Sequence, residues 1–130
     1  MPIVQVYLPG EQTDQLKKMV IEKISDAIVA VGCGPIDRVR IVIQEMGRTN
    51  QNGTPGPLAM NDKNGNHGPR LHMFLIEGRS TDVKKLLADK LAMALVEAGC
   101  GRLEKVQVSI QDIPSSAWGI GGKTARDLGR

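Results

Sequence analysis

The chain has 130 residues, 17 basic and 14 acidic side chains, a formal net charge of +3 and only 2% aromatic residues. This length corresponds to one domain, and the sequence lacks the dense basic stripe with interleaved aromatic residues that is typical of nucleic-acid-binding proteins. The mild positive charge fits a small anionic substrate, and no apolar stretch is long enough to span a membrane.

Residues 3–8 are rich in β-branched side chains and predict a strand, which ends at Pro9 and Gly10. A helix is expected next, from a cap at Thr13 or Asp14 to about Val31. Its apolar positions follow the i, i+3, i+4 pattern of an amphipathic helix. They are Leu16, Met19, Val20, Ile24, Ala27, Ile28 and Val31.

A Gly-Cys-Gly-Pro turn over residues 32–35 ends this helix, and Val39, Ile41 and Ile43 then alternate as in a half-buried strand. A shift of 67 residues aligns 2–46 with 69–113 without a gap. Repeats of this kind are structural units. Identical pairs include Pro2/Pro69, Lys17/Lys84, Lys23/Lys90, Gly32/Gly99, Cys33/Cys100, Gly34/Gly101 and Gln44/Gln111.

Each half is therefore predicted to be β-α-β, with its two strands parallel through a right-handed crossover. Two such units give an α/β (α+β) fold, in which a four-stranded mixed sheet carries both helices on one face. We expect a single domain over residues 1–130. It comprises a first unit over 2–46, a Gly- and Asn-rich linker over 47–68, and a second unit over 69–130 that ends in a hairpin. Each half alone would bury too little surface for stability.

Cys33 and Cys100 occupy equivalent positions, without a CxxC pattern or any other metal-ligand spacing. A disulfide between them is one alternative, but a repeated Gly-Cys-Gly turn explains both more simply. We therefore expect no metal and no other cofactor. No secretory signal precedes Pro2, which favours a cytoplasmic protein.

The segment that starts with Trp118 and continues Gly-Ile-Gly-Gly has two interpretations. A phosphate-binding glycine loop is disfavoured, because the segment neither follows a strand–helix junction nor has the Walker spacing. A tight hairpin that displays Trp118 is the better prediction.

Pro2 is the first candidate for chemistry, and the alternative is that Met-Pro is a common start without functional meaning. Removal of Met1 would leave it as a secondary amine with a fixed φ, whereas Pro69 is always locked in an amide. A free α-amino group titrates near pH ~8, and burial or nearby guanidinium groups would lower this pKa. The neutral amine would then be a general base and its conjugate acid a general acid.

These features resemble the 4-oxalocrotonate tautomerase family. The resemblance rests on the start at Pro2, the strand 39–46, the Glu77-Gly78-Arg79 turn and the glycine-rich segment after Trp118. It covers nearly the whole chain outside the linker, and the chain resembles two short family members fused together. The family implies a cofactor-free tautomerase that acts on an anionic enol or dienol carboxylate, and the longer members imply a homotrimer.

The resemblance also assigns roles to particular residues. It implies Pro2 as the acid and base, and Arg40 as the strand arginine that polarises the oxygenated end of the substrate. Arg79 would hold the substrate carboxylate, Trp118 would make the site hydrophobic, and Arg38 is the substitute for Arg40.

The two halves have kept different parts of this set. The first half has Gln12 at the position of Arg79, and the second has Gln107 at the position of Arg40. We therefore expect Pro2 of one half to lie beside Arg79 and Trp118 of the other. Arg40 would come from the same chain or from a neighbouring one.

Three alternatives remain. A dehalogenase or hydratase of the superfamily would need an arginine where Ile76 stands and a histidine in the first helix, and both are missing. A decarboxylase would need a Pro-Arg turn, although Asp37 before Arg38 resembles its aspartate. A non-catalytic scaffold protein with the same fold is the third.

Overall fold

The computed structural model describes residues 2–10, 12–46 and 68–130. Most of the expected linker, 47–67, therefore lies outside the described residues. The principal elements are β1 (Ile3–Pro9), α1 (Asp14–Val31), β2 (Arg40–Met46), β3 (Arg70–Ile76), α2 (Thr81–Glu97) and β4 (Gln107–Ile113). Short elements are the 3₁₀ turns η1 (Ile36–Arg38), η2 (Leu103–Lys105) and η3 (Ser115–Ala117) and the strands β5 (Gly119–Ile120) and β6 (Lys123–Thr124).

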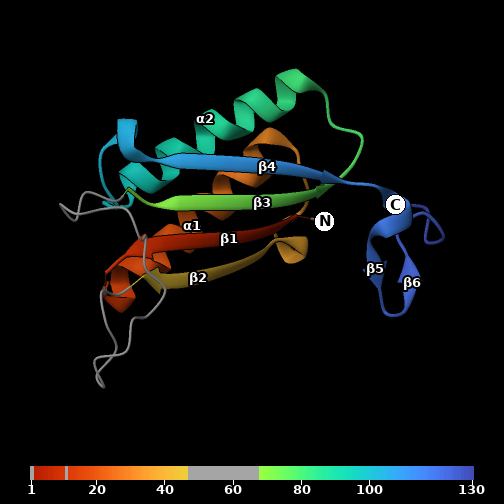
Figure 1. Cartoon of the computed structure of the whole chain (residues 1–130), viewed down its shortest axis with the longest axis horizontal. Coiled ribbons are helices and arrows are strands. Elements are labelled where there is room, and N and C mark those ends of the chain that lie inside the picture. The colour runs from red at the N-terminus through yellow and green to blue at the C-terminus, as the bar shows by residue number, and fades with distance from the viewer. Residues whose placement is uncertain (1, 11, 47–67) are drawn as a thin grey trace.

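The first four strands form one sheet in the order β2-β1-β3-β4. Strands β1 and β2 are parallel, as are β3 and β4, and the two halves join where β1 runs antiparallel to β3. Both helices lie side by side on one face of this sheet (Figure 1). The predicted fold class, a four-stranded mixed sheet with two helices on one face, is confirmed.

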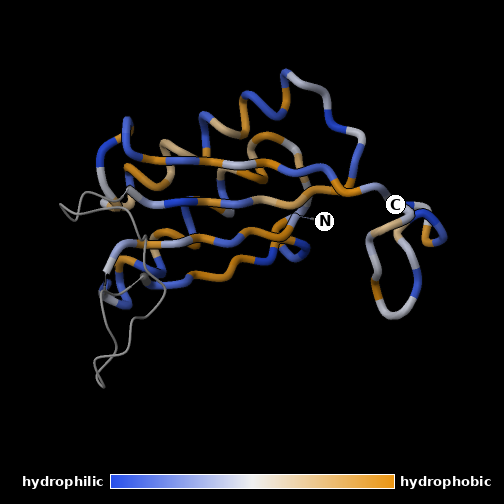
Figure 2. The backbone as a smooth tube through the Cα atoms, in the orientation of Figure 1, coloured by the Kyte–Doolittle hydropathy of each residue, from blue (hydrophilic) through white to orange (hydrophobic). Residues whose placement is uncertain are grey.

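The core lies between the sheet and the helices. Val4, Val6 and Leu8 of β1 are fully buried and pack with the inner face of both helices, including Ile24 and Leu91. The strand residues between them point to the other, open face, because successive side chains of a strand alternate. Figure 2 shows hydrophobic and hydrophilic residues interspersed along both helices, and hydrophobic runs along parts of the strands.

Local chemistry sets the helix ends as expected. The Thr13 hydroxyl accepts a hydrogen bond from the Leu16 amide (3.1 Å), and the Ser80 hydroxyl accepts one from the Val83 amide (3.2 Å). These bonds satisfy amides that the helix itself leaves free. Gly32 ends α1 in the left-handed region at φ 83°, which favours glycine. Both cysteines are free thiols, so the disulfide alternative is wrong.

The C-terminal hairpin differs from the prediction. Its turn is formed by Gly121 and Gly122, and Trp118 precedes β5 and is only 7% exposed. The expectation that the hairpin displays Trp118 is therefore wrong. The indole instead packs against Ile76 and Ala125 in a small second core, because burying a large aromatic side chain is strongly favourable.

The repeat extends to ion pairs. Lys17 of α1 bonds to Glu45 of β2 (2.6 Å), and the equivalent Lys84 of α2 bonds to Asp112 of β4 (2.7 Å). Each pair ties a helix to the strand that follows it. The hydrogen bond from Lys17 is the main reason why the pKa of Glu45 lies below its ordinary value.

This pair predicts a pH-dependent stability. A carboxyl group with a depressed folded pKa stabilises the protein above its ordinary pKa, near 4.5, and this stabilisation is lost as the pH falls through the folded pKa. We expect Glu45→Gln to lower Tm at pH 7 and to lower it less at about pH 3. Thermal melts at both values check this, with Glu22→Gln on α1 as the control. An equal loss of Tm at both pH values would contradict the prediction.

Candidate active site

Pro2 is buried at the start of β1. Its carbonyl oxygen accepts a hydrogen bond from the Arg40 amide (3.1 Å), which fixes it beside the start of β2. The turn after α1 closes over the ring, because a Cβ on Gly34 would lie 3.5 Å from Pro2 Cδ. Gly34 has φ 142°, a backbone conformation that residues other than glycine rarely adopt. Backbone therefore approaches the proline ring closely.

Arg79 reaches this turn from the other half of the chain. It lies half-buried between β3 and α2, and its Nη2 donates a long hydrogen bond (3.5 Å) to the carbonyl oxygen of Cys33. Cys33 directly precedes Gly34, so the contact brings the guanidinium group to the segment that covers Pro2. The equivalent Gln12 turns back on its own loop and donates to Pro9 O (2.8 Å).

Trp118 lines a hollow beside the strand that begins after Pro2. The hollow has a volume of roughly 280 Å³ and lies on the open face of the sheet, at the base of the C-terminal hairpin. Its lining is entirely without charged side chains. The lining residues are Ile3, Phe74, Ile113, Ala117, Trp118 and Gly119.

The remaining two arginines lie outside this lining. Arg40 begins β2 at the register position of Ile3, but its Nη1 donates to the carbonyl oxygens of Asp37 (2.7 Å) and Val39 (3.2 Å). The side chain is thus folded over its own turn. Arg38 is exposed at the end of η1. Within one chain, the structure therefore brings Arg79 to the turn over Pro2 and Trp118 to the hollow beside Ile3, and neither Arg40 nor Arg38 lines that hollow.

Phe74, which a shift of 67 residues aligns with Tyr7, has no role in the sequence-based assignment. The structure makes it the strand neighbour of Ile3 across the β1–β3 junction, with the two Cα atoms directly paired. The pairing of β1 with β3 would have revealed this position. That pairing joins the two halves and cannot be read from the sequence of either half alone.

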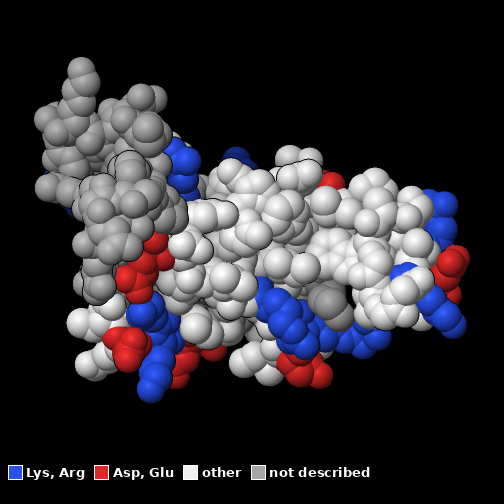
Figure 3. All heavy atoms as spheres, turned by 60° about the horizontal axis from the view of Figure 1, so that its bottom comes forward, with Lys and Arg blue, Asp and Glu red and all other residues white. Residues whose placement is uncertain are grey.

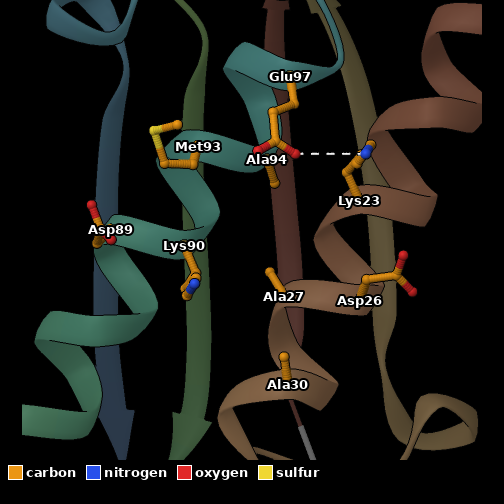
Figure 4. A pocket seen from close by; sticks show the side chains of 9 residues that line it. All are labelled: Lys23, Asp26, Ala27, Ala30, Asp89, Lys90, Met93, Ala94 and Glu97. Atoms are coloured by element: carbon orange, nitrogen blue, oxygen red, sulfur yellow. Dashed lines mark ion pairs between the residues drawn. The ribbon is translucent and has the colours of Figure 1, made fainter.

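A second hollow, of roughly 370 Å³, lies between α1 and α2 (Figure 4). Its lining mixes alanines with Lys and Asp or Glu side chains, and Lys23 pairs with Glu97 across it (3.6 Å). The lining has three acidic and two basic side chains, which does not favour an anionic substrate, and none of the predicted site residues contributes. We therefore do not consider this hollow as the active site.

Charged side chains cover only part of the surface. Figure 3 shows an uncharged area in the middle of the visible face, with a group of Lys and Arg side chains below it. Burial raises the pKa of the Cys100 thiol, which disfavours the reactive thiolate.

Among the described residues, no group of three His, Cys, Asp or Glu side chains could hold a metal ion. No helix in the same part of the chain is long and apolar enough to cross a bilayer.

Known proteins resemble this chain in sequence and in fold. Residues 2–51 match the family model described as tautomerase enzyme. A 2-hydroxymuconate tautomerase of Pseudomonas putida is 42% identical over 62 residues, which are 48% of this chain and 98% of that protein. A solved structure described as native fused 4-OT is 31% identical, with a TM-score of 0.84 over 98% of this chain and 99% of that one. Another, described as the R7 fused 4-OT asymmetric trimer, is 32% identical with a TM-score of 0.81 over the same shares.

The chain belongs to the 4-oxalocrotonate tautomerase family. It is a fused member, because the short relative spans about half of it and the fused structures span nearly all of it. It is therefore an isomerase with tautomerase activity. Within this tautomerase, the contact between Arg79 and the turn over Pro2 is made by residues of both repeats.

Proposed function

We propose that this tautomerase converts enols and 2-hydroxydienoates, such as phenylenolpyruvate or 2-hydroxymuconate, to ketones, with Pro2 as acid and base and without a cofactor. The supporting observation is the contact of Arg79 with the Cys33 carbonyl, which brings a carboxylate-binding cation to the segment covering Pro2. The proposal requires that Met1 is removed, so that the Pro2 nitrogen is a free secondary amine.

The proposed reaction is a proton transfer within one substrate molecule. The neutral amine takes the proton of the enol hydroxyl, and the freed electron pair forms the ketone C=O bond. The C=C electrons shift to the carbon that receives the proton from the ammonium group, so that the product is an isomer. Burial of the ring supports this role, because it disfavours the charged ammonium form and favours the neutral base.

The arginines would stabilise the charges of the substrate. Arg79 would bind the carboxylate through its planar pair of donors. Arg40 would stabilise the developing enolate oxygen, either in its own chain or in a neighbour, after leaving the carbonyl groups of its own turn. Arg38, exposed beside it, is the substitute for this role. Trp118 would exclude water from the site.

We further propose that the chain assembles as a homotrimer, since the similar R7 fused 4-OT is described as an asymmetric trimer. The open face of the sheet supports this, since it carries Val42 at 58% exposure next to half-buried side chains of β1. Analytical ultracentrifugation checks the assembly, and a purely monomeric chain at micromolar concentration would contradict it.

Mass spectrometry tests the central step. We expect the intact mass to lack Met1, and an acetylenic keto acid such as 2-oxo-3-pentynoate to add once per chain, on Pro2. Peptide mapping distinguishes this from addition at Pro69, which has no amine. A chain that retains Met1, or a label located elsewhere, would contradict the proposal.

A further inference from the structure

The hollow beside Ile3 has the properties of a substrate subsite. Ile3 directly follows Pro2, so the hollow begins one residue from the proposed base. Ile3, Phe74 and Ile113 lie on the open face of the sheet, and Ala117, Trp118 and Gly119 come from the segment that leads into the hairpin. A group attached to the reacting enol would meet these side chains.

Phe74 is held in place on the open face. Its Cα is paired with that of Ile3, and its ring stacks on His72 with centroids 4.4 Å apart and planes tilted by 38°. His72 in turn shares a hydrogen bond with Gln111 of β4 (3.3 Å). An aromatic wall supported in this way presents a defined surface, because its neighbours limit the rotation of the ring.

Size and polarity decide what the hollow accepts. Its volume of roughly 280 Å³ exceeds the cavity of about 150 Å³ that is known to hold a benzene molecule, so a phenyl ring has room. The hollow is open to solvent and its lining has no cation, so a carboxylate would gain no ion pair there, whereas an aryl group would bury apolar surface. Arg40 does not supply a cation, because it does not line the hollow and its proposed partner is the enolate oxygen at Pro2.

We propose that this hollow receives the substituent of the enol that lies opposite the substrate carboxylate. It makes the enzyme selective for aryl-substituted enol monocarboxylates over enol dicarboxylates. Phe74 is the specificity-determining residue. The inference rests on the proposed function, because it assumes that the carboxylate lies at Arg79 and the reacting carbon at Pro2.

Steady-state kinetics with phenylenolpyruvate and 2-hydroxymuconate test the selectivity. We expect wild-type kcat/KM to be at least about ten-fold higher for the aryl substrate. Phe74→Leu removes the ring but keeps an apolar side chain, and it should lower this preference about ten-fold, the scale of one aromatic contact. Tyr7→Leu is the matched control, since Tyr7 is the repeat equivalent of Phe74 on the open face and does not line the hollow. A wild-type preference for the dicarboxylate, or equal shifts in both variants, would overturn the inference.

A binding measurement separates this inference from the chemistry. Trp118 is the only tryptophan, so its fluorescence reports ligands in the hollow. We expect 3-phenylpropionate to bind more tightly than adipate, and Phe74→Leu to remove most of this difference while melting curves confirm that it is folded. If neither enol is turned over but this pattern holds, the proposed chemistry fails and the subsite stands. If both enols are turned over and adipate binds more tightly, the chemistry stands and the subsite is refuted.

Discussion

Inserting one glycine between Met1 and Pro2 is expected to lower kcat about 10²- to 10⁴-fold, the usual contribution of a positioned acid–base group. The insertion turns Pro2 into an amide and moves the free amine by up to about 3.8 Å, one Cα–Cα step. The ring would remain beside Gly34, so the binding of substrate should change less than the chemistry. Initial rates at saturating phenylenolpyruvate, followed by ultraviolet absorbance, measure the effect.

The repeat offers a matched control for this experiment. Pro69 has the same surroundings as Pro2, since a Cβ on Gly101 would lie 3.5 Å from Pro69 Cδ and the Gln107 amide donates to Pro69 O (3.1 Å). Pro69→Ala should therefore cost stability but leave kcat unchanged. Pro2→Ala, which leaves a primary amine, should lose activity only in part. Full activity in the glycine-extended chain would exclude Pro2 as the base.

Replacing Arg79 with glutamine is expected to have the second-largest effect. The variant reproduces the residue of the first half, Gln12, and removes the charge near the turn over Pro2. Hydrogen bonds to a charged group are worth about 1.5–3 kcal/mol, which corresponds to roughly a 10- to 100-fold loss in kcat/KM. Because the carboxylate is bound in both ground and transition states, most of the loss should appear in KM.

Two further variants show whether this loss is specific to the binding of the carboxylate. Gln12→Ala, the equivalent change in the first half, should leave KM unaffected because the Gln12 side chain donates to the Pro9 carbonyl of its own loop. Arg79→Lys keeps the charge but loses the planar pair of donors, so an intermediate KM is expected. Melting curves distinguish these effects from the loss of the Cys33 contact. An unchanged KM in Arg79→Gln would refute the carboxylate role.

Several parts of the fold could be predicted because their causes are local. Apolar periodicity located both helices, and Thr13 and the glycine after Val31 marked the ends of the first one. The shift of 67 residues then transferred the same elements to the second half. The candidate residues also followed from short patterns, since Pro2, Arg40 and Arg79 each lie in a recognisable segment.

The environment of Trp118 could not be predicted in the same way. A glycine-rich hairpin indicates a tight turn, but it does not reveal which neighbouring surface the indole will find. Burial against Ile76 depends on where β3 ends relative to the hairpin. For the same reason, the sequence did not reveal that Phe74 lies beside the hollow. This position follows from its pairing with Ile3, which is 71 residues earlier in the sequence.

By itself, the sequence determined that the protein consists of two equivalent β-α-β units with a single proline able to become an amine. Only the tertiary structure decided that β1 and β3 pair antiparallel, which places the start of the first strand beside the end of the third. This pairing brings Arg79 to the turn over Pro2 and forms the uncharged hollow next to Ile3. The physical reason is that propensity and periodicity act over a few residues, whereas the position of one half against the other is set by burying the shared core.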